Sequence, residues 1–123
     1  MRVALLQYSI AWADKETNLR MAEEHIAALA GKADVAVLPE MFATGFCTDH
    51  PELAETMDGE IIRRLQAIAD KSGVAIVSSF ICLPDSQTKL TNRGFIIKPH
   101  APMEIQDKRH LYAHGGEDLF FSP

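Results

Sequence analysis

Two stretches of the sequence carry side chains that could do acid–base chemistry. In the first, ADVAVLPEMFATGF at residues 33–46, Glu40 follows a short apolar run that ends at Leu38. A buried carboxylate without a partner is strongly destabilising, so Glu40 is expected either to be solvated or to be paired and functional. Ligands and catalysis in parallel α/β sheets gather where strands end, and an apolar surround makes a carboxylate a stronger base. This position favours a general base, and a solvated loop acid is the alternative.

The second stretch, QDKRHLYAHGGED at residues 106–118, brings a lysine together with histidines and acids. Lys108 stands at the end of a short extended segment, where a lysine is most often an exposed surface residue. Paired with Glu40, however, it would supply the cation that compensates a carboxylate in an apolar surround. We therefore expect Glu40 and Lys108 to lie at neighbouring strand ends with their side chains facing one cavity.

The same stretch contains residues that can bind metal ions. His110 and His114 have a spacing that places two imidazoles on one face of a helix, and Glu117 follows three residues later. Gly115 and Gly116 destabilise a helix at this point. We therefore expect neither a metal ion nor any other cofactor.

The N-terminal part of the chain predicts a strand–helix–strand unit. Residues 2–8 and 35–38 predict strands, and the segment between them has apolar residues at helical spacing. Asp14 is the candidate cap of this helix and Gly31 its expected end. The apolar positions are Leu19, Ala22, Ile26 and Leu29. A connection of this kind makes the two strands parallel.

The remaining sequence predicts a long connection, a second helix and three more strands. Residues 39–59 form the connection, with one short helical turn around 52–56, and loops of this length are usually functional. A helix is predicted over 59–72, with Asp58 as its cap and Gly73 as its end. The predicted strands are 74–81, 93–98 and 103–108, with a turn at 84–86 that makes the first two antiparallel. Residues 109–123 predict a loop.

Composition and charge exclude several classes of protein. The chain has 123 residues, the size of one domain, and a net charge of −5 without a cluster of Lys or Arg, which argues against a nucleic-acid partner. Two cysteines are too few for a disulfide framework and indicate a reducing, cytoplasmic setting. No segment approaches the ~20 apolar residues of a membrane span. The N-terminal apolar run, interrupted by Gln7 and Ser9, is too short for a signal peptide.

The predicted helices are too few for the predicted sheet. Strands 74–81 and 93–98 read as apolar on both faces, whereas two amphipathic helices can cover only one face. The other face therefore needs a cover, either a further part of the same domain or an obligate partner subunit.

With matching order, spacing and placement after strands, VLPEMFATGF and DKRHLYAHGGED resemble motifs of the nitrilase superfamily of carbon–nitrogen hydrolases. The opening MRVALLQYSIAWADKETNLRMAEEHI is similar to that family's first strand and first helix, so the resemblance spans essentially the whole chain. It implies an α/β fold, namely the N-terminal part of a nitrilase-like αββα sandwich with the order β-α-β-α-β-β-β. Residues 1–123 are then an incomplete domain, and the intact protein is expected to be a homodimer or larger.

The resemblance also implies a Glu-Lys-Cys catalytic triad. Glu40 matches the general base, and Lys108 matches the cation that stabilises the oxyanion. Glu117 matches a second glutamate that orients the lysine and the substrate. The family's cysteine nucleophile follows the lysine on a strand-to-helix turn, so we expect it outside this chain. Cys47 lacks that context, and Cys82 closes an apolar strand and reads as a small core residue.

The form DKRHLYAHGGED, with Arg109 and His110 after the lysine, resembles the omega-amidase branch. That branch implies a small-molecule amide substrate: the terminal amide of short dicarboxylic or 2-oxo acid monoamides is hydrolysed to acid and ammonia. This chain alone is then expected to be inactive. Two alternatives stay open, a non-catalytic module that binds a small molecule or a partner, and a phosphoacceptor-type signalling domain. The latter needs later helices that this sequence lacks.

Overall fold

The computed structural model describes residues 1–85 and 89–123, and its elements follow the predicted order. They are β1 (Val3–Leu5), α1 (Lys15–Ala27), β2 (Val35–Val37), η1 (Pro51–Leu53), α2 (Glu60–Ser72), β3 (Ala75–Cys82), β4 (Thr91–Ile97), β5 (Glu104–Asp107), η2 (Ala113–Gly115) and α3 (Glu117–Phe120), where η denotes a 3-10 helix. The predicted turn at 84–86 includes Ser86, which lies outside the described residues.

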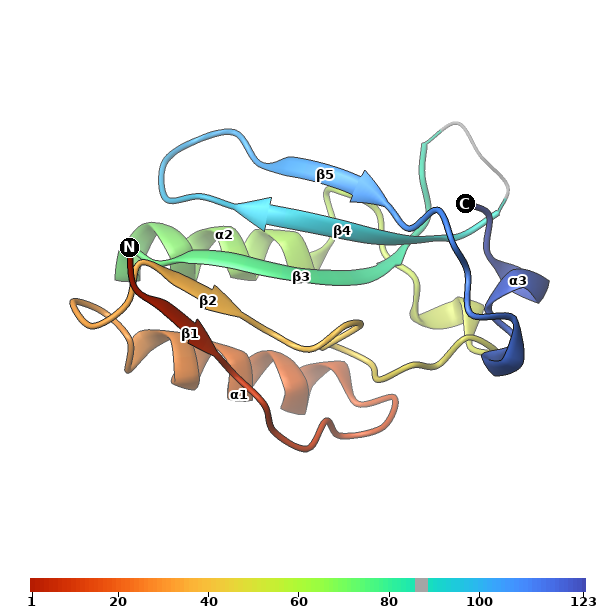
Figure 1. Ribbon diagram of the computed structural model, residues 1–123, viewed down its shortest axis with the longest axis horizontal. Coiled ribbons are helices and arrows are strands. Elements are labelled where there is room, and N and C mark those ends of the chain that lie inside the picture. The colour runs from red at the N-terminus through yellow and green to blue at the C-terminus, as the bar shows by residue number, and fades with distance from the viewer. Residues whose placement is uncertain (86–88) are drawn as a thin grey trace.

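A five-stranded sheet in the order β1-β2-β3-β4-β5 forms the frame of the molecule (Figure 1). β1, β2 and β3 are parallel, whereas β4 is antiparallel to β3 and β5 is antiparallel to β4. The α/β class and the β-α-β-α-β-β-β order are confirmed. With these directions, β1, β2, β3 and β5 all end at the same edge of the sheet, and β4 begins there.

The first helix begins as predicted and ends earlier than predicted. The Asp14 side chain caps α1 by accepting a hydrogen bond from the Thr17 backbone N–H at 3.1 Å. The helix ends at Ala27, and residues 28–32 form turns that include Gly31. The apolar residues at helical spacing therefore extend beyond the helix itself, because Leu29 in the turn also packs against the core.

The second helix is capped from a distance. Gly73, with φ of 73°, ends α2 as predicted, but the expected cap by Asp58 is wrong because Gly59 occupies that position. Glu55 Oε1 instead accepts a hydrogen bond from the Ile61 backbone N–H at 2.8 Å. A Cβ on residue 59 would lie 2.6 Å from the same Glu55 oxygen, so the glycine makes room for this cap. No helix in the described ranges is long and apolar enough to cross a membrane.

Three further segments differ most from their predictions, while the predicted bounds of β2, α2, β3, β4 and β5 lie within two residues of the observed ones. The strand predicted over 2–8 is reduced to Val3–Leu5, because β1 is an edge strand that pairs only with β2 over three residues. The helical turn expected at 52–56 is η1, one residue earlier. Residues 109–123 are not entirely a loop, since Gly116 adopts a left-handed conformation (φ 75°) and α3 begins directly after it.

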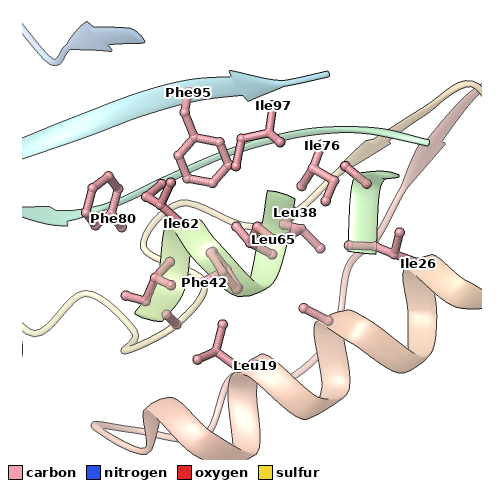
Figure 2. Close-up of a cluster of buried hydrophobic side chains, with 14 of the residues drawn as sticks. Leu19, Ile26, Leu38, Phe42, Ile62, Leu65, Ile76, Phe80, Phe95 and Ile97 are labelled. Carbon is pink, nitrogen blue, oxygen red and sulfur yellow. The ribbon is translucent and has the colours of Figure 1, made fainter. Parts of the chain in front are cut away.

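Both long helices pack on one face of the sheet and bury the main hydrophobic core against it (Figure 1, Figure 2). The largest contributions come from α1, α2, β3, β4 and the residues after β2. The side chains labelled in Figure 2 are Leu19, Ile26, Leu38, Phe42, Ile62, Leu65, Ile76, Phe80, Phe95 and Ile97. This core holds the sheet in place, including the edge at which β1, β2, β3 and β5 end.

The opposite face of the sheet carries an apolar row. Leu5, Val37, Val77 and Ile96 are paired in register across four strands; Leu5 and Ile96 are exposed, and the two valines between them are partly exposed. Nearer the edge where the strands end, this face also carries polar side chains, Ser79 on β3 and Asn92 on β4, beside buried Ile81. These strands are therefore apolar on both faces over most of their length, with polar residues added at that edge.

Candidate active site

Four polar side chains meet at the edge where the strands end. Lys108 Nζ lies 2.9 Å from Glu40 Oε1 and 3.1 Å from Glu117 Oε2. Asn92 Nδ2 donates hydrogen bonds to Glu40 Oε1 at 2.7 Å and to Glu117 Oε1 at 3.1 Å. These contacts close a ring in which one cation and one amide link two carboxylates. We call these four residues the polar cluster.

Glu40 stands on a turn that packing against β3 holds in place. After β2, the Leu38 backbone N–H still donates to Val77 O at 2.9 Å. Met41, the residue after Glu40, has φ of 49°, a left-handed conformation that costs an L-residue roughly 1–2 kcal/mol. Its backbone N–H bonds Ser79 Oγ at 3.0 Å and its side chain is fully buried. These tertiary contacts offset the strain and orient the glutamate.

Lys108 reaches Glu40 from a strand that is not a neighbour of β2. It follows β5 directly, and its backbone N–H donates to Asn92 O at 2.9 Å, which extends the β4–β5 pairing. Because β3 and β4 lie between β2 and β5, the expectation of neighbouring strand ends is wrong. The two side chains do face one pocket of about 310 Å³, which Ser79 and Asn92 also line.

Glu117 is fully buried, which is rare for a glutamate without partners. It is the first residue of α3, and its Oε2 accepts a hydrogen bond from the Tyr112 backbone N–H at 2.6 Å in addition to the contact with Lys108. With Asn92 on Oε1, three donors compensate this carboxylate. The contact with Lys108 fits the predicted role of Glu117 as a glutamate that orients the lysine.

The electrostatic surroundings keep Lys108 charged. Burial opposes its protonation, but the hydrogen bonds and charges of Glu40 and Glu117 outweigh that effect and raise the pKa of Lys108 above its usual range. The Phe46 ring centroid lies 5.4 Å from Nζ, within the range of a cation–π contact. Lys108 is therefore an ammonium at neutral pH, suited to stabilising negative charge beside it.

An aromatic wall borders the polar cluster. The rings of Phe46 and Tyr112 meet edge to face with centroids 6.2 Å apart. Together with Lys108 and His110 they line a second pocket, of about 500 Å³. Gly115 permits this packing, because a Cβ at that position would lie 2.7 Å from a Tyr112 ring carbon. The pocket combines a cation with apolar surface, an arrangement that can hold a small polar molecule.

Glu40 is more exposed than its apolar neighbours in the sequence suggest. Met41 and Phe42 are fully buried in the hydrophobic clusters, whereas Leu38 and Phe46 line the two pockets that Glu40 also lines. The Glu40 side chain is 48% exposed. Apolar side chains therefore surround Glu40 only in part, and Glu40 is both half-solvated and paired with Lys108.

Neither cysteine has the environment of a nucleophile. Cys47 and Cys82 are fully buried, and burial is the main cause that raises the pKa of both thiols. The Cys47 thiol also donates to the backbone oxygen of Thr44 at 3.2 Å. Reactive cysteines need a lowered pKa and partial exposure, so these two thiols behave as core residues.

The histidines and the arginine around Lys108 are placed at the surface. Arg109, His110 and His114 are exposed, His110 lines the second pocket, and the His114 ring lies 6.1 Å from that of Tyr112. Within residues 1–85 and 89–123, no three His, Cys, Asp or Glu side chains are grouped so that they could hold a metal ion.

Sequence reasoning missed Asn92 and the role of Phe46 beside Lys108. Asn92 directly precedes the predicted strand 93–98, where an asparagine usually belongs to a turn, so its residue type gave no sign of a contact with Glu40. The period-two alternation of β4 was the available signal, since it places Asn92 on the face opposite the core, with Gly94 and Ile96. For Phe46, nothing in the sequence indicates a partner so far along the chain.

Comparison with known proteins adds three findings. The carbon-nitrogen hydrolase family model matches residues 2–122. The chain is 29% identical to Omega-amidase YafV of Escherichia coli (strain K12), over 98% of this chain and 46% of that protein. It is 27% identical to 2-oxoglutaramate amidase of Bacillus subtilis (strain 168), over 98% of this chain and 47% of that protein. XC1258 from Xanthomonas campestris, a CN-hydrolase superfamily protein, has a crystal structure that superposes with a TM-score of 0.91 at 31% identity, over 98% of this chain and 45% of that chain.

The chain thus spans about half the length of the relatives that it matches. Its fold matches that of XC1258 over nearly all of its own residues, which confirms the predicted α/β architecture.

Proposed function

Because the chain belongs to the carbon-nitrogen hydrolase family, we propose that it is the N-terminal part of an omega-amidase. The substrates are short dicarboxylic or 2-oxo acid monoamides, whose terminal amide reacts with water to give a carboxylic acid and ammonia. The similarity to proteins named omega-amidase and 2-oxoglutaramate amidase supports this substrate class. The observation that carries the proposal is the position of Lys108 Nζ, which lies 2.9 Å from Glu40 and 3.1 Å from Glu117.

In this proposal Glu40 is the general base. Glu40 takes the proton of a cysteine thiol, and the thiolate attacks the carbonyl carbon of the amide. The tetrahedral intermediate collapses with cleavage of the C–N bond, and the proton on Glu40 leaves with the nitrogen as ammonia. Glu40 then takes a proton from water, whose oxygen attacks the thioester. The second tetrahedral intermediate expels the cysteine thiolate, which takes the proton back from Glu40, and the carboxylic acid is released.

Lys108 stabilises the oxyanion that forms in each tetrahedral intermediate. Its raised pKa keeps the ammonium charged at neutral pH, and buried Glu117 holds it in one position. A preorganised donor at a developing oxyanion contributes roughly 10²–10³ in rate. Glu117 acts through Lys108 and is a positioning residue in this scheme.

The nucleophile of this proposal is a cysteine outside residues 1–123. Cys47 and Cys82 are buried thiols with raised pKa values, which disfavours the thiolate. The relatives are about twice as long as this chain, which leaves room for the third triad residue. The chain by itself is therefore expected to be inactive.

We also propose that residues 1–123 are one portion of an αββα sandwich whose remaining portion covers the outward sheet face. The apolar row of Leu5, Val37, Val77 and Ile96, exposed or partly exposed throughout, supports this, because soluble monomers rarely expose large contiguous apolar patches. The intact protein is then a homodimer or larger oligomer, and its cytoplasmic setting stays a prediction.

The test is hydrolysis of 2-oxoglutaramate by the intact protein that carries this chain, followed as ammonia release. Glu40→Gln and Lys108→Met are each expected to lower kcat by roughly 10²-fold or more. Glu24→Gln and Lys71→Met change exposed residues of α1 and α2 in the same way and are expected to keep activity. Full activity of Glu40→Gln would refute the mechanism. Binding of the monoamide without hydrolysis by the unaltered protein would favour a binding module instead.

A further inference from the structure

Asn92 is the neutral member of the polar cluster, and its orientation is fixed. The residue is 2% exposed, and its amide nitrogen donates one hydrogen bond to each of the two carboxylates, Glu40 and Glu117. A flipped amide would direct its oxygen against two carboxylate oxygens, which accept and cannot donate. Both N–H groups are therefore committed to the site.

The two oxygens of Glu40 are not equivalent. Oε1 accepts from Asn92 Nδ2 at 2.7 Å and from Lys108 Nζ at 2.9 Å. In the part of the chain that the structure describes, no donor bonds Oε2 of this residue. Hydrogen bonds to a carboxylate oxygen withdraw its electron density, so the oxygen without donors is the more available one for a proton.

We propose that Asn92 is a positioning residue that makes Oε2 the proton-accepting oxygen of Glu40. The inference rests on the proposed function, in which Glu40 is the general base. Asn92 and Lys108 hold Oε1 from two sides, which sets the plane of the carboxylate and thereby the direction of Oε2. When Oε2 takes a proton, Oε1 becomes the carbonyl oxygen and still accepts from both donors. The base therefore stays in place in both of its protonation states.

An amide suits this position better than a charged side chain. A cation at residue 92 would stabilise the ionised form of Glu40 and weaken it as a base, whereas a carboxylate would repel both glutamates. The amide offers two donors without a net charge. Its own oxygen is buried without a hydrogen-bond partner in the described residues, which costs stability. The two hydrogen bonds that its nitrogen donates are the contribution that offsets this cost.

Steady-state kinetics of Asn92 variants of the intact protein test the proposal. Asn92→Leu keeps a similar volume and removes both donors. It is expected to lower kcat by about 10- to 100-fold, with KM changed by less than about threefold. Asn92→Ser, with one hydroxyl donor, is expected to lie between Asn92→Leu and the unaltered protein.

Ile62→Val is the control for a loss of stability alone, since Ile62 is a residue of α2 that is buried in the core. It is expected to lower stability and to keep both kcat and KM. Unchanged kcat in Asn92→Leu, in a protein whose activity depends on Glu40, would overturn the positioning role and leave the proposed function intact. Full activity of Glu40→Gln would overturn the proposed function instead.

A second measurement needs neither turnover nor a folded Asn92 variant. In protein labelled with ¹⁵N on asparagine, the two side-chain amide protons of Asn92 are expected far downfield, because both are bonded to carboxylates. Glu40→Ala should move one of the two signals toward the range of a solvated amide. Asn92 amide signals that are identical in Glu40→Ala and in the unaltered protein would overturn the contact on which the proposal depends.

Discussion

Replacing Lys108 by methionine tests how the protein tolerates the buried carboxylate of Glu117. Methionine keeps much of the aliphatic chain and removes the ammonium that lies 3.1 Å from Glu117 Oε2 and 2.9 Å from Glu40 Oε1. Glu117 is 0% exposed, so water cannot replace the lost partner unless α3 moves. The N–H donors of Asn92 and Tyr112 remain in place.

The expected loss in the free energy of unfolding is about 2–3 kcal/mol. Removal of one partner from a buried ion pair costs roughly 3–5 kcal/mol. The Lys108 side chain is 30% exposed and Glu117 keeps two donors, which reduces that cost. The contact with Glu40 adds less than about 1 kcal/mol, since that carboxylate is 48% exposed.

Chemical denaturation at neutral pH measures this loss, and a double-mutant cycle with Glu117→Gln identifies its cause. In the Lys108→Met background, Glu117→Gln should restore about 1 kcal/mol or more, because it removes the unpaired buried charge. Lys71→Met, an exposed substitution on α2, should change stability by less than about 0.5 kcal/mol. A double variant less stable than Lys108→Met alone would refute the role of Lys108 as the counter-charge of Glu117.

Two further predictions follow from the surroundings of Lys108. Its pKa is raised in the folded protein above the usual lysine value of about 10.4, so its contribution to stability is fully present below that pH and is lost as the pH rises through the folded-state pKa. As the pH rises from neutral, the difference in unfolding free energy between the unaltered protein and Lys108→Met should therefore persist until strongly alkaline buffer, and a difference already lost at mildly alkaline pH would contradict this assignment. Gly115→Ala places a Cβ 2.7 Å from Tyr112 and 3.1 Å from Phe46, so it should displace the aromatic wall and lower stability by about 1–3 kcal/mol. Denaturation of this variant checks the value, and Gly115→Ala should cost less in a Tyr112→Ala background, where the ring is absent. Equal costs in the two backgrounds would contradict the packing argument.

Local patterns in the sequence predict most of the helix and strand order. The cap of α1 at Asp14 and the end of α2 at Gly73 require only residues close to them in the chain, and both are observed. The predicted cap of α2 fails for the opposite reason, because the donor of Ile61 is satisfied by Glu55, a side chain of the preceding connection. Local rules give no means to choose between two such oxygens.

For the candidate site, the sequence by itself determined which residue types were available and in what order. Glu40, Lys108 and Glu117 follow from motifs that resemble a known family, and the structure brings their side chains together. The sequence could not determine how exposed these side chains are. The carboxylate expected in an apolar surround is half-exposed, whereas Glu117 is fully buried. Exposure depends on what packs over a residue, and those segments are distant in the chain.

Only the tertiary structure decided which side chains touch. Asn92 and Glu40 are 52 residues apart, and Lys108 and Glu40 are 68 apart, yet each pair is in hydrogen-bond contact. The sheet brings them together because β2, β3 and β5 end where β4 begins. Strand register is set by the pairing of all the strands at once, and a shift by one residue would turn Asn92 to the opposite face. No short stretch of sequence contains that information.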